Sequence, residues 1–450
     1  MTARVAVVGG GISGLVSAYR LRQSLGPDAD IVLVDDSGRA GGKLRTTRLA
    51  GGPFDVGAEA FIVRRSEVPD LAAELGLGSR IVHPGGSRPL IWSNGRTHAL
   101  PAGTLMGIPK NSEALAGLVD ERTLARITAE RDRPFEWRPG SDVTVADLVG
   151  DRFGEQVVRR SVDPLLGGVY SGTADTIGVR AALPTLAAAL DRGAPNLSAA
   201  VAEAIPSAGE GPVFGAFRDG YAELTDALTA KARPTFVEAQ ARGLRRDGNA
   251  WSLDPIGRVD GLVLAVSAPR LAELLTEAAP GAAEIAGGIS TASSAVVALA
   301  FSAQEALPES SGILVATGEE LTAKAFTLSS RKWPHLAERD VQTVRVSFGR
   351  FGDSCVVNLP DSELVEAARR DLATVTGVDA EPVDEAVVRW RDGLPQYGRG
   401  HTERIEKLEE HVGRLDSLEV AGAVLHGVGV PACIRTATTA VTRLLSRVAG

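Results

Sequence analysis

The sequence predicts an α/β fold in which a Rossmann-like dinucleotide-binding domain is joined to an antiparallel-sheet domain and a helical domain. Three observations lead to this prediction. A glycine-rich turn lies between a buried strand and a helix near the N-terminus, strand-like runs separated by turns fill residues 295–348, and residues 112–197 are Ala/Leu-rich with helical periodicity in segments such as 145–160. At 450 residues, the chain is long enough for two or three cores.

Composition and charge narrow the classes of protein to which this chain can belong. The net charge is −8 at neutral pH, which argues against nucleic acid as the main partner. Hydrophobic residues make up 44% of the chain, yet no apolar run approaches the roughly 20 residues that span a bilayer. The cysteines, Cys355 and Cys433, are far apart, and the six histidines form no cluster with ligand spacing. We therefore expect a cytoplasmic protein without a metal site, whose contact with membranes is at most peripheral.

The N-terminal segment has the pattern of a dinucleotide-binding βαβ unit. Residues 5–8 are apolar and mostly β-branched, which is typical of a strand buried on both faces. Gly9, Gly11 and Gly14 follow: the first permits the turn, the second lets a pyrophosphate approach, and the third lets helix and strand pack closely. Asp35, at the end of the next strand, is placed to bond a ribose hydroxyl, while the helix N-terminus offers N–H groups to the phosphates.

A second glycine-rich segment indicates which dinucleotide is bound. Gly41, Gly42 and Lys43 follow the acidic residue closely. A plain NAD-binding domain does not need this second glycine pair, whereas a chain that passes close beneath an extended FAD does. The small residues Gly57 and Ala58 would then let the backbone approach the isoalloxazine ring. A surface turn is the alternative explanation for the glycine pair.

Two further segments are candidates for contact with a substrate. Arg64 and Arg65 follow the expected flavin segment directly, where anionic groups of a substrate would need partners. Solvated surface charges are the alternative. Residues 163–172, DPLLGGVYSG, are too rich in glycine for the interior of a helix. We expect either a kinked loop that lines a cavity or a corner between two helices.

The middle of the chain is expected to contain mostly strands. Residues 236–244 and 250–253 are expected to form a hairpin, and a buried strand at 259–266 returns to the first domain. Because further strands alternate with turns rather than long helices, a mostly antiparallel sheet follows; these strands are predicted at 295–301, 312–315 and 343–348. A helix is expected from residue 361 or 362 to about Gly377.

The C-terminal segment repeats the arrangement of strand, glycine turn and helix. Residues 420–425 are apolar, and HGVGVPACI at 426–434 enters a final helix that is expected to end near Val448. The N-terminus of that helix would point N–H groups at something anionic. If this is the N1/C2=O edge of a flavin, the helix dipole stabilises the reduced, anionic flavin. An ordinary turn between strand and helix is the alternative.

Together these segments resemble the FAD-dependent porphyrinogen oxidases, a family within the amine oxidase-like flavoprotein superfamily. The resemblance covers most of the chain. The glycine motifs at 7–15 and 41–43 and the C-terminal motif belong to the whole superfamily, whereas three motifs are more specific to porphyrinogen oxidation: GGVYSG at 167–172, KWPH at 332–335 and LPQYGRGH at 394–401.

The resemblance implies FAD as cofactor and three domains. The FAD-binding domain would comprise residues 1–80, 205–270 and 400–450, the substrate-binding domain residues 81–105 and 271–399, and the helical domain residues 106–204. The FAD contacts carried over from the family are Gly9, Gly10, Gly11, Ile12, Ser13, Gly14, Asp35, Gly42, Gly57, Ala58, Glu59, Ala60, Ala241, Thr402, Val428, Gly429 and Val430. The substrate contacts are Arg64, Arg65, Gly168, Tyr170, Leu314, Lys332 and Ser347.

The resemblance further implies oxidation of coproporphyrinogen III to coproporphyrin III in haem biosynthesis. A hydride would pass from a meso carbon to flavin N5, and dioxygen would reoxidise the flavin with release of peroxide. The run GTLMGIP places Leu105 or Met106 where the eukaryotic protoporphyrinogen oxidases carry a substrate-binding arginine, which favours coproporphyrinogen. Protoporphyrinogen IX oxidation is the closest alternative, and a flavin amine oxidase or a non-enzymatic escort protein of the same fold are more distant ones. A transient contact with a ferrochelatase stays open.

Glu59 is the best-placed candidate for a catalytic base. A carboxylate desolvated beside the flavin would have a raised pKa, as a general base requires. The alternative, which we favour, is a structural acid paired with Arg64 or Arg65. The flavin itself is expected to carry the chemistry.

Overall fold

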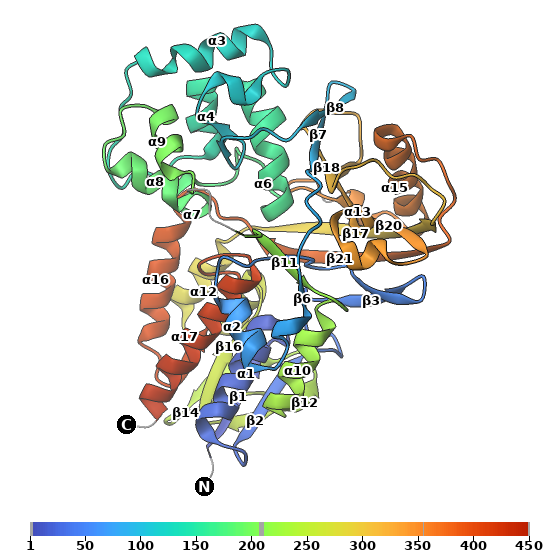
Figure 1. Ribbon diagram of the computed structural model, residues 1–450. Coiled ribbons are helices and arrows are strands. Elements are labelled where there is room, and N and C mark those ends of the chain that lie inside the picture. Colours follow the sequence, from blue (N-terminus) through green and yellow to red (C-terminus); the bar gives the residue numbers. More distant parts are fainter. Residues whose placement is uncertain (1–2, 207–210, 354, 449–450) are drawn as a thin grey trace.

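The computed structural model describes residues 3–206, 211–353 and 355–448. Its elements form three lobes, each with its own core (Figure 1). A parallel-sheet lobe lies at the bottom of the view, an antiparallel-sheet lobe at the right and a helical lobe at the top. Among the described residues, no helix combines the length and apolar character needed to cross a membrane, and no three His, Cys, Asp or Glu side chains gather as a metal site needs.

The parallel-sheet lobe is built on five strands in the order β12–β2–β1–β16–β22, and all neighbouring pairs are parallel. Because side chains alternate along a strand, Val5 and Val7 face one layer of the lobe while Ala6 and Val8 face the other. Both faces are therefore buried, as the apolar run predicts. The strands come from distant parts of the chain: β1 (Arg4–Val8), β2 (Asp30–Asp35), β12 (Thr235–Glu238), β16 (Gly261–Leu264) and β22 (Leu418–Val420).

Helices cover one face of this sheet, and helices with a small sheet cover the other. The first layer contains α1 (Ile12–Leu25), α2 (Glu67–Glu74), α10 (Ala222–Ala232) and α17 (Val430–Val448). The second contains α11 (Ala268–Leu275), α12 (Pro280–Gly287), α16 (His401–Gly413), β13 (Arg242–Asp247), β14 (Ala250–Asp254) and β15 (Gly257–Val259).

Two details differ from the sequence expectations for this lobe. The hairpin pairs β13 with β14, but residues 236–238 do not belong to it, because β12 lies beside β2 in the parallel sheet. The apolar side chains of α11 and α12 pack in the core of this lobe, whereas the predicted boundary assigns residues from 271 onward to the substrate-binding domain. The domain boundaries themselves stay a prediction.

The antiparallel-sheet lobe contains seven strands in the order β21–β17–β20–β19–β18–β7–β8. All neighbours are antiparallel except β7 and β18, which confirms the expected mostly antiparallel sheet. Helix α15 (Asp361–Thr376) covers one face and ends, as predicted, at Gly377 with φ +78°. The strands are β7 (Leu90–Ser93), β8 (Arg96–Ala99), β17 (Thr291–Ser302), β18 (Gly312–Val315), β19 (Ala323–Leu328), β20 (Val341–Phe348) and β21 (Asp384–Pro395).

The helical lobe packs short helices around one core. They are η2 (Ser112–Leu115), α3 (Glu121–Ala129), η3 (Glu130–Asp132), α4 (Val145–Phe153), α5 (Glu155–Val157), the π-helix η4 (Val158–Val162), α6 (Asp163–Tyr170), α7 (Val179–Ala182), α8 (Pro184–Asp191) and α9 (Leu197–Ala204).

The expectation of a kinked loop or helix corner at 163–172 is wrong for most of that segment. Gly167 and Gly168 lie inside helix α6, which ends at Ser171 with φ +51°. Glycine costs a helix about 1 kcal/mol relative to alanine, but buried Leu166 and Tyr170 anchor α6 in the core of the lobe. The irregular backbone is the π-helix immediately before it.

Short elements connect the lobes. A three-stranded sheet in the order β5–β11–β6 lies between the lobes in Figure 1. The hairpin β3–β4 brings Phe54 and Val56 against Ala298, Val388 and Trp333 of the antiparallel-sheet lobe. These elements are β3 (Thr46–Leu49), β4 (Gly52–Asp55), β5 (Phe61–Ile62), β6 (Ile81–Val82), β9 (Thr104–Leu105), β10 (Ile108–Pro109), β11 (Phe214–Phe217), η1 (Gly78–Arg80), α13 (Ser329–Lys332), α14 (Pro334–Ala337) and η5 (Val356–Asn358).

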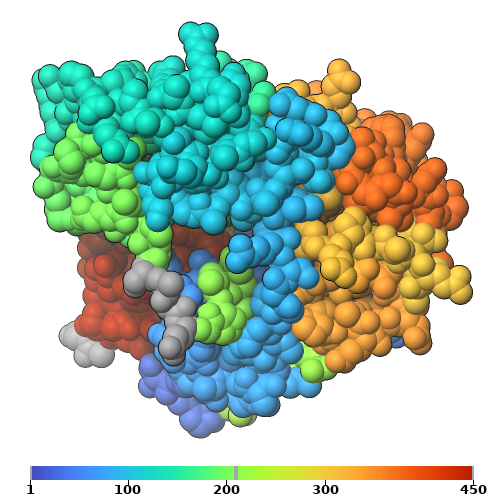
Figure 2. Space-filling model, turned by 45° about the horizontal axis from the view of Figure 1, so that its top comes forward, coloured from blue at the N-terminus to red at the C-terminus, as the bar shows by residue number. Residues whose placement is uncertain are grey.

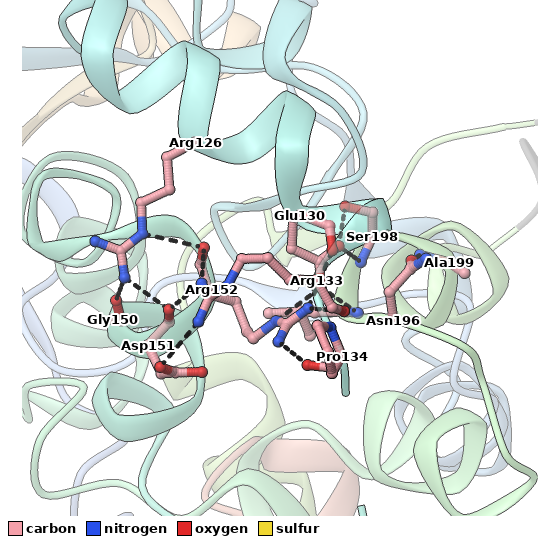
Figure 3. Close-up of polar contacts among 11 residues, drawn as sticks. Arg126, Glu130, Arg133, Pro134, Gly150, Asp151, Arg152, Asn196, Ser198 and Ala199 are labelled. Atoms are coloured by element: carbon pink, nitrogen blue, oxygen red, sulfur yellow. Dashed lines mark hydrogen bonds and ion pairs between the residues drawn. The ribbon is translucent and has the colours of Figure 1, made fainter. Parts of the chain in front are cut away.

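A buried ion pair organises the helical lobe (Figure 3). Arg152 of α4 and Glu130 of η3 are 3% and 0% exposed, and Arg152 Nε lies 2.9 Å from Glu130 Oε1. Arg152 also donates to backbone carbonyls, including that of Pro134 at 2.8 Å. Glu130 accepts N–H groups of Leu197 and Ser198, at 2.8 and 3.2 Å, and so caps the start of α9. One pair therefore ties three elements together.

Removing one partner of this pair should destabilise the protein strongly. In Arg152→Met the Glu130 carboxylate stays buried without its cation, and we expect a loss of about 3–5 kcal/mol. Arg133→Met is the matched control, because the exposed pair of Arg133 with Asp151 contributes less than about 1 kcal/mol. Thermal unfolding of the three proteins measures the difference. Equal midpoints for both variants would show that the pair does not organise the lobe.

Candidate functional site

The predicted cofactor residues of the first glycine segment, together with Asp35, lie at the carboxyl ends of the parallel strands β1 and β2. Helix α1 begins just beyond β1, and Ser13 Oγ of its first turn lies 3.4 Å from the carbonyl oxygen of Cys433 in α17. The starts of α1 and α17 are therefore neighbours. Neither helix has an acidic residue in its first turn, and no side chain caps α1. The positive ends of two helix dipoles and the N–H groups of α1 are thus available to an anionic ligand.

The two glycine segments lie side by side in this site. The Gly41 N–H donates to the Gly10 carbonyl at 2.8 Å. A Cβ atom on Gly42 would lie 2.8 Å from the Cα of Gly11, and one on Gly14 would lie 1.8 Å from the Gly9 carbonyl oxygen. No larger residue fits at Gly42 or Gly14 without moving the backbone. Gly14 therefore has the close-packing role that the motif predicts.

Asp35 and Ala241 lie at one end of the site. Asp35 Oδ2 accepts the Gly10 N–H at 2.6 Å, which fixes the carboxylate beside the glycine turn. The end of β2 is also joined to the segment that leads to Ala241, because the Ala239 N–H donates to the Asp35 carbonyl at 3.1 Å. Ala241 is buried, and its carbonyl accepts a hydrogen bond from Arg270. The predicted adenine contact would share this acceptor with Arg270.

Residues 57–60 form a wall between the parallel-sheet and antiparallel-sheet lobes. The Ala58 N–H donates to the Lys43 carbonyl at 3.0 Å, and a Cβ atom on Gly57 would lie 1.9 Å from that same oxygen. From the other side, Arg345 Nη2 of β20 donates to the Gly57 carbonyl at 2.6 Å. The backbone that would face the flavin is thus held by both lobes.

Glu59 is the charged centre of this wall. Its carboxylate is 12% exposed and lies 2.6 Å from Lys332 Nζ and 3.9 Å from Arg345 Nη1. Ser329 Oγ donates to the same carboxylate at 3.2 Å. The cations beside Glu59 are thus Lys332 and Arg345 of the antiparallel-sheet lobe, and the expected pairing with its sequence neighbours Arg64 or Arg65 is wrong.

The expected rise in the pKa of Glu59 is also wrong. Burial alone would raise this pKa, but the nearby charges of Lys332 and Arg345 outweigh burial and lower it to about 2. Asp55 behaves oppositely: burial raises its pKa to about 7, although Thr46 and the Tyr221 N–H donate to it. Glu59 is therefore ionised at neutral pH and firmly paired.

The predicted substrate residues of the helical and antiparallel-sheet lobes come together. Gly168 and Val169 on α6 are exposed, and a Cβ on Gly168 would lie 3.9 Å from Leu314 Cδ2. Tyr170 is buried in the helical core against which Leu314 also packs. Figure 2 shows the surface hollowed beneath the helical lobe, with the red C-terminal segment at the back.

The basic and polar residues predicted to bind the substrate differ in how exposed they are and in whether their charge is already paired. Arg65 is exposed and close enough to Tyr170 to oppose the rise in its pKa, which burial brings to about 12. Arg64, also exposed, is the second residue after β5. Ser347 shares the face of β20 with Arg345, since the two are two residues apart. Lys332 instead has its charge taken up by Glu59.

The C-terminal candidates are only partly close to the glycine segments. Val430 is buried at the start of α17, Val428 packs against the helical lobe, and Gly429 between them is exposed. Thr402 is exposed in the first turn of α16. Its contact with a flavin stays a prediction.

The residues present fit an FAD molecule. Two helix starts and the paired glycine segments suit a pyrophosphate, Asp35 suits a ribose, and the wall at 57–60 suits an isoalloxazine ring.

Two residues of the site were not predicted from the sequence: Lys43 was absent from the predicted site residues, and Arg345 was given no role towards Glu59. The place of Lys43 directly after the glycine pair and the single cation in the buried run of β20 were the available signals.

Comparison with known proteins agrees with this geometry. Residues 12–445 match the family described as flavin containing amine oxidoreductase. A coproporphyrinogen III oxidase from Mycobacterium tuberculosis is 52% identical over 98% of this chain and 96% of its own, and a protoporphyrinogen oxidase from Bos taurus is 26% identical over 98% of both. A crystal structure of an Exiguobacterium protein assigned as a protoporphyrinogen oxidase superposes with a TM-score of 0.87, at 28% identity over 98% of both chains. The chain therefore belongs to the flavin-containing amine oxidoreductases and, within them, to the FAD-dependent coproporphyrinogen III and protoporphyrinogen oxidases.

Proposed function

We propose that this protein oxidises coproporphyrinogen III to coproporphyrin III in the cytoplasm, as a step of haem biosynthesis. The observation that carries the proposal is the 52% identity with a relative of that name, which extends over 98% of this chain and thus over all three lobes. Exposed Gly168 on α6 lies beside Leu314 of the antiparallel-sheet lobe, where a bound substrate would contact both lobes.

FAD, when bound, supplies the acceptor for a hydride from a meso carbon of the substrate and is returned to its oxidised form by dioxygen, with release of peroxide. The protein holds and orients the two molecules. The segment 57–60 is fixed between lobes by Lys43 and Arg345, and the face of α6 with Gly168 covers the substrate side. Contact with a ferrochelatase would follow from the need to pass the porphyrin on for iron insertion.

Glu59 acts in this proposal as a structural acid. An ionised carboxylate whose pKa is held at about 2 by Lys332 and Arg345 accepts a proton poorly at neutral pH. Its pairing instead joins the parallel-sheet lobe to the antiparallel-sheet lobe beside the flavin wall. The proton from a pyrrole N–H then leaves to solvent or to another group.

The substrate carries four propionates, whereas protoporphyrinogen carries two. A protein of net charge −8 must gather positive charge locally to bind the tetra-acid. Arg65 is the best-placed candidate, because it is exposed and its charge acts on Tyr170 of the helical lobe, with Arg64 beside it in the chain. Lys332 is a weaker candidate, since Glu59 already neutralises it.

Aerobic oxidation of the two porphyrinogens side by side tests the function. The purified protein with FAD should convert coproporphyrinogen III to a fluorescent porphyrin with the higher kcat/KM. A preference for protoporphyrinogen IX would make it a protoporphyrinogen oxidase, and no turnover of either would overturn the proposal.

Glu59→Gln should lower the free energy of unfolding strongly and kcat only slightly. At neutral pH, the variant leaves Lys332 and Arg345 without their anion, and we expect a loss of about 3–5 kcal/mol. Because the folded-state pKa of Glu59 lies below its ordinary value of 4.5, this stabilisation is present above pH 4.5 and is lost as the pH falls towards 2. Thermal midpoints of both proteins should therefore converge as the pH is lowered through this range.

The same variant separates the structural role from a catalytic one. With full FAD content at a temperature where both proteins are folded, kcat should fall less than about tenfold, below the usual contribution of a general base. A loss of about a hundredfold or more, together with a lost acidic limb in the pH profile of kcat, would make Glu59 the base after all.

Reversing the charge of Arg65 should affect the two substrates unequally. Arg65→Glu should raise KM for coproporphyrinogen III by about tenfold or more and raise that for protoporphyrinogen IX less. Arg122→Glu on the exposed side of α3 changes the net charge equally and is the control. Equal rises in KM for both substrates would show that Arg65 does not select the tetra-acid.

A further inference from the structure

A single tyrosine holds the loop that leads into α17 at two points. This loop, residues 421–429, is called the flavin loop below. Tyr397, only 2% exposed, donates its hydroxyl hydrogen to the Ala423 carbonyl at 2.6 Å and accepts the Gly427 N–H at 2.7 Å. One hydroxyl group thus acts as donor and acceptor for two residues four positions apart.

His401 holds the same loop at a third point. Its ring stacks on that of Tyr397, with centroids 3.9 Å apart and an angle of 16° between the planes. His401 Nε2 lies 3.1 Å from the Leu425 carbonyl oxygen, and because a carbonyl only accepts, Nε2 must carry the hydrogen. Burial lowers the pKa of His401 to about 4, so the ring is neutral and keeps this tautomer at neutral pH.

The flavin loop is also fixed from the side of α17. The Gly422 N–H donates to Thr436 Oγ1 at 3.0 Å. Gly427 has φ +143°, and a Cβ atom there would lie 2.7 Å from the Cβ of Ala432. The loop therefore has one shape, and that shape sets where the first N–H groups of α17 point.

The residues that fasten the loop also reach the helical lobe. The Tyr397 ring lies 5.7 Å from that of Tyr170, and Gln396 Nε2 donates to the Tyr170 carbonyl at 2.8 Å. The Gly178 N–H donates to the Tyr397 carbonyl at 2.7 Å. Helix α7, which begins next to Gly178, packs against α16 (Figure 1). The motif LPQYGRGH thus joins the flavin loop to α6, which carries GGVYSG.

We propose that Tyr397 and His401 are positioning residues, which hold the flavin loop so that its N–H groups and the start of α17 stabilise the reduced form of FAD. Losing either side chain leaves buried loop carbonyl or N–H groups without partners and lets the loop move away from the cofactor. Because helix N–H groups and dipole favour the anionic reduced flavin most, the reduction potential should fall together with the affinity. This inference rests on the FAD-dependent function proposed above, but not on which porphyrinogen is oxidised.

FAD titration of four variants tests the proposal. Tyr397→Phe removes only the hydroxyl, and His401→Leu removes the donor, whereas His401→Gln keeps an N–H near the position of Nε2. Tyr19→Phe is the matched control: it removes from α1 of the same lobe a hydroxyl that contacts Gln23 and Glu74 but not the loop. The dissociation constant of FAD, its visible spectrum and its reduction potential are measured on FAD-depleted, refilled protein.

Tyr397→Phe and His401→Leu should each raise the dissociation constant by about tenfold or more and shift the potential to a more negative value. His401→Gln and Tyr19→Phe should stay near the wild type. Wild-type affinity and potential in Tyr397→Phe and His401→Leu, or the same losses in all four variants, would overturn the proposal. If Tyr397→Phe does not fold, the two His401 variants decide it. A wild-type protein that binds no FAD would overturn the proposed function as well.

Discussion

One buried carboxylate, Glu59, connects the two sheet lobes where they would face the cofactor. Lys332 and Arg345 approach it from the antiparallel-sheet lobe, and Arg345 also donates to the Gly57 carbonyl. Because both cations outweigh the cost of burial, the carboxylate stays ionised and the wall at 57–60 stays in place. The proposed positions of flavin and substrate would both depend on that wall. The charge at the site thus sets geometry, and the redox step is left to the cofactor.

The rest of the site is built from backbone groups at one edge of the parallel sheet. The starts of α1 and α17 meet there, although more than 400 residues separate the two helices in the chain. Hydrogen bonds hold two backbone segments in place at this edge. One is the pair of glycine segments, and the other is the flavin loop, which Tyr397 and His401 contact. Helix α6 of the helical lobe adds the exposed Gly168 and Val169, so all three lobes contribute residues to the candidate site.

Local patterns in the sequence were sufficient to predict much of this fold. Strand β18 was predicted at its observed bounds because its apolar run is short and ends in turns, and the glycine turn at 9–14 specifies its own geometry. Helix α6 was missed, because the cost of two glycines is visible in sequence while the packing of Leu166 and Tyr170 is not. The partners of Glu59 were also missed: Lys332 lies 273 residues away in the chain, and no local pattern shows which distant cation reaches a buried acid. The arginines nearest in sequence, Arg64 and Arg65, were therefore wrongly predicted as the partners of Glu59.

We propose above all that the tetrapyrrole binds between α6 and a flavin placed on the wall at 57–60. A crystal structure of the FAD-loaded protein with coproporphyrin III tests it most directly. We expect an isoalloxazine ring against Gly57 and Ala58, the porphyrin between that ring and Gly168 and Leu314, and the ion pair of Glu59 with Lys332 intact. A porphyrin bound elsewhere, or a Glu59 carboxylate turned away from Lys332 towards the substrate, would contradict it.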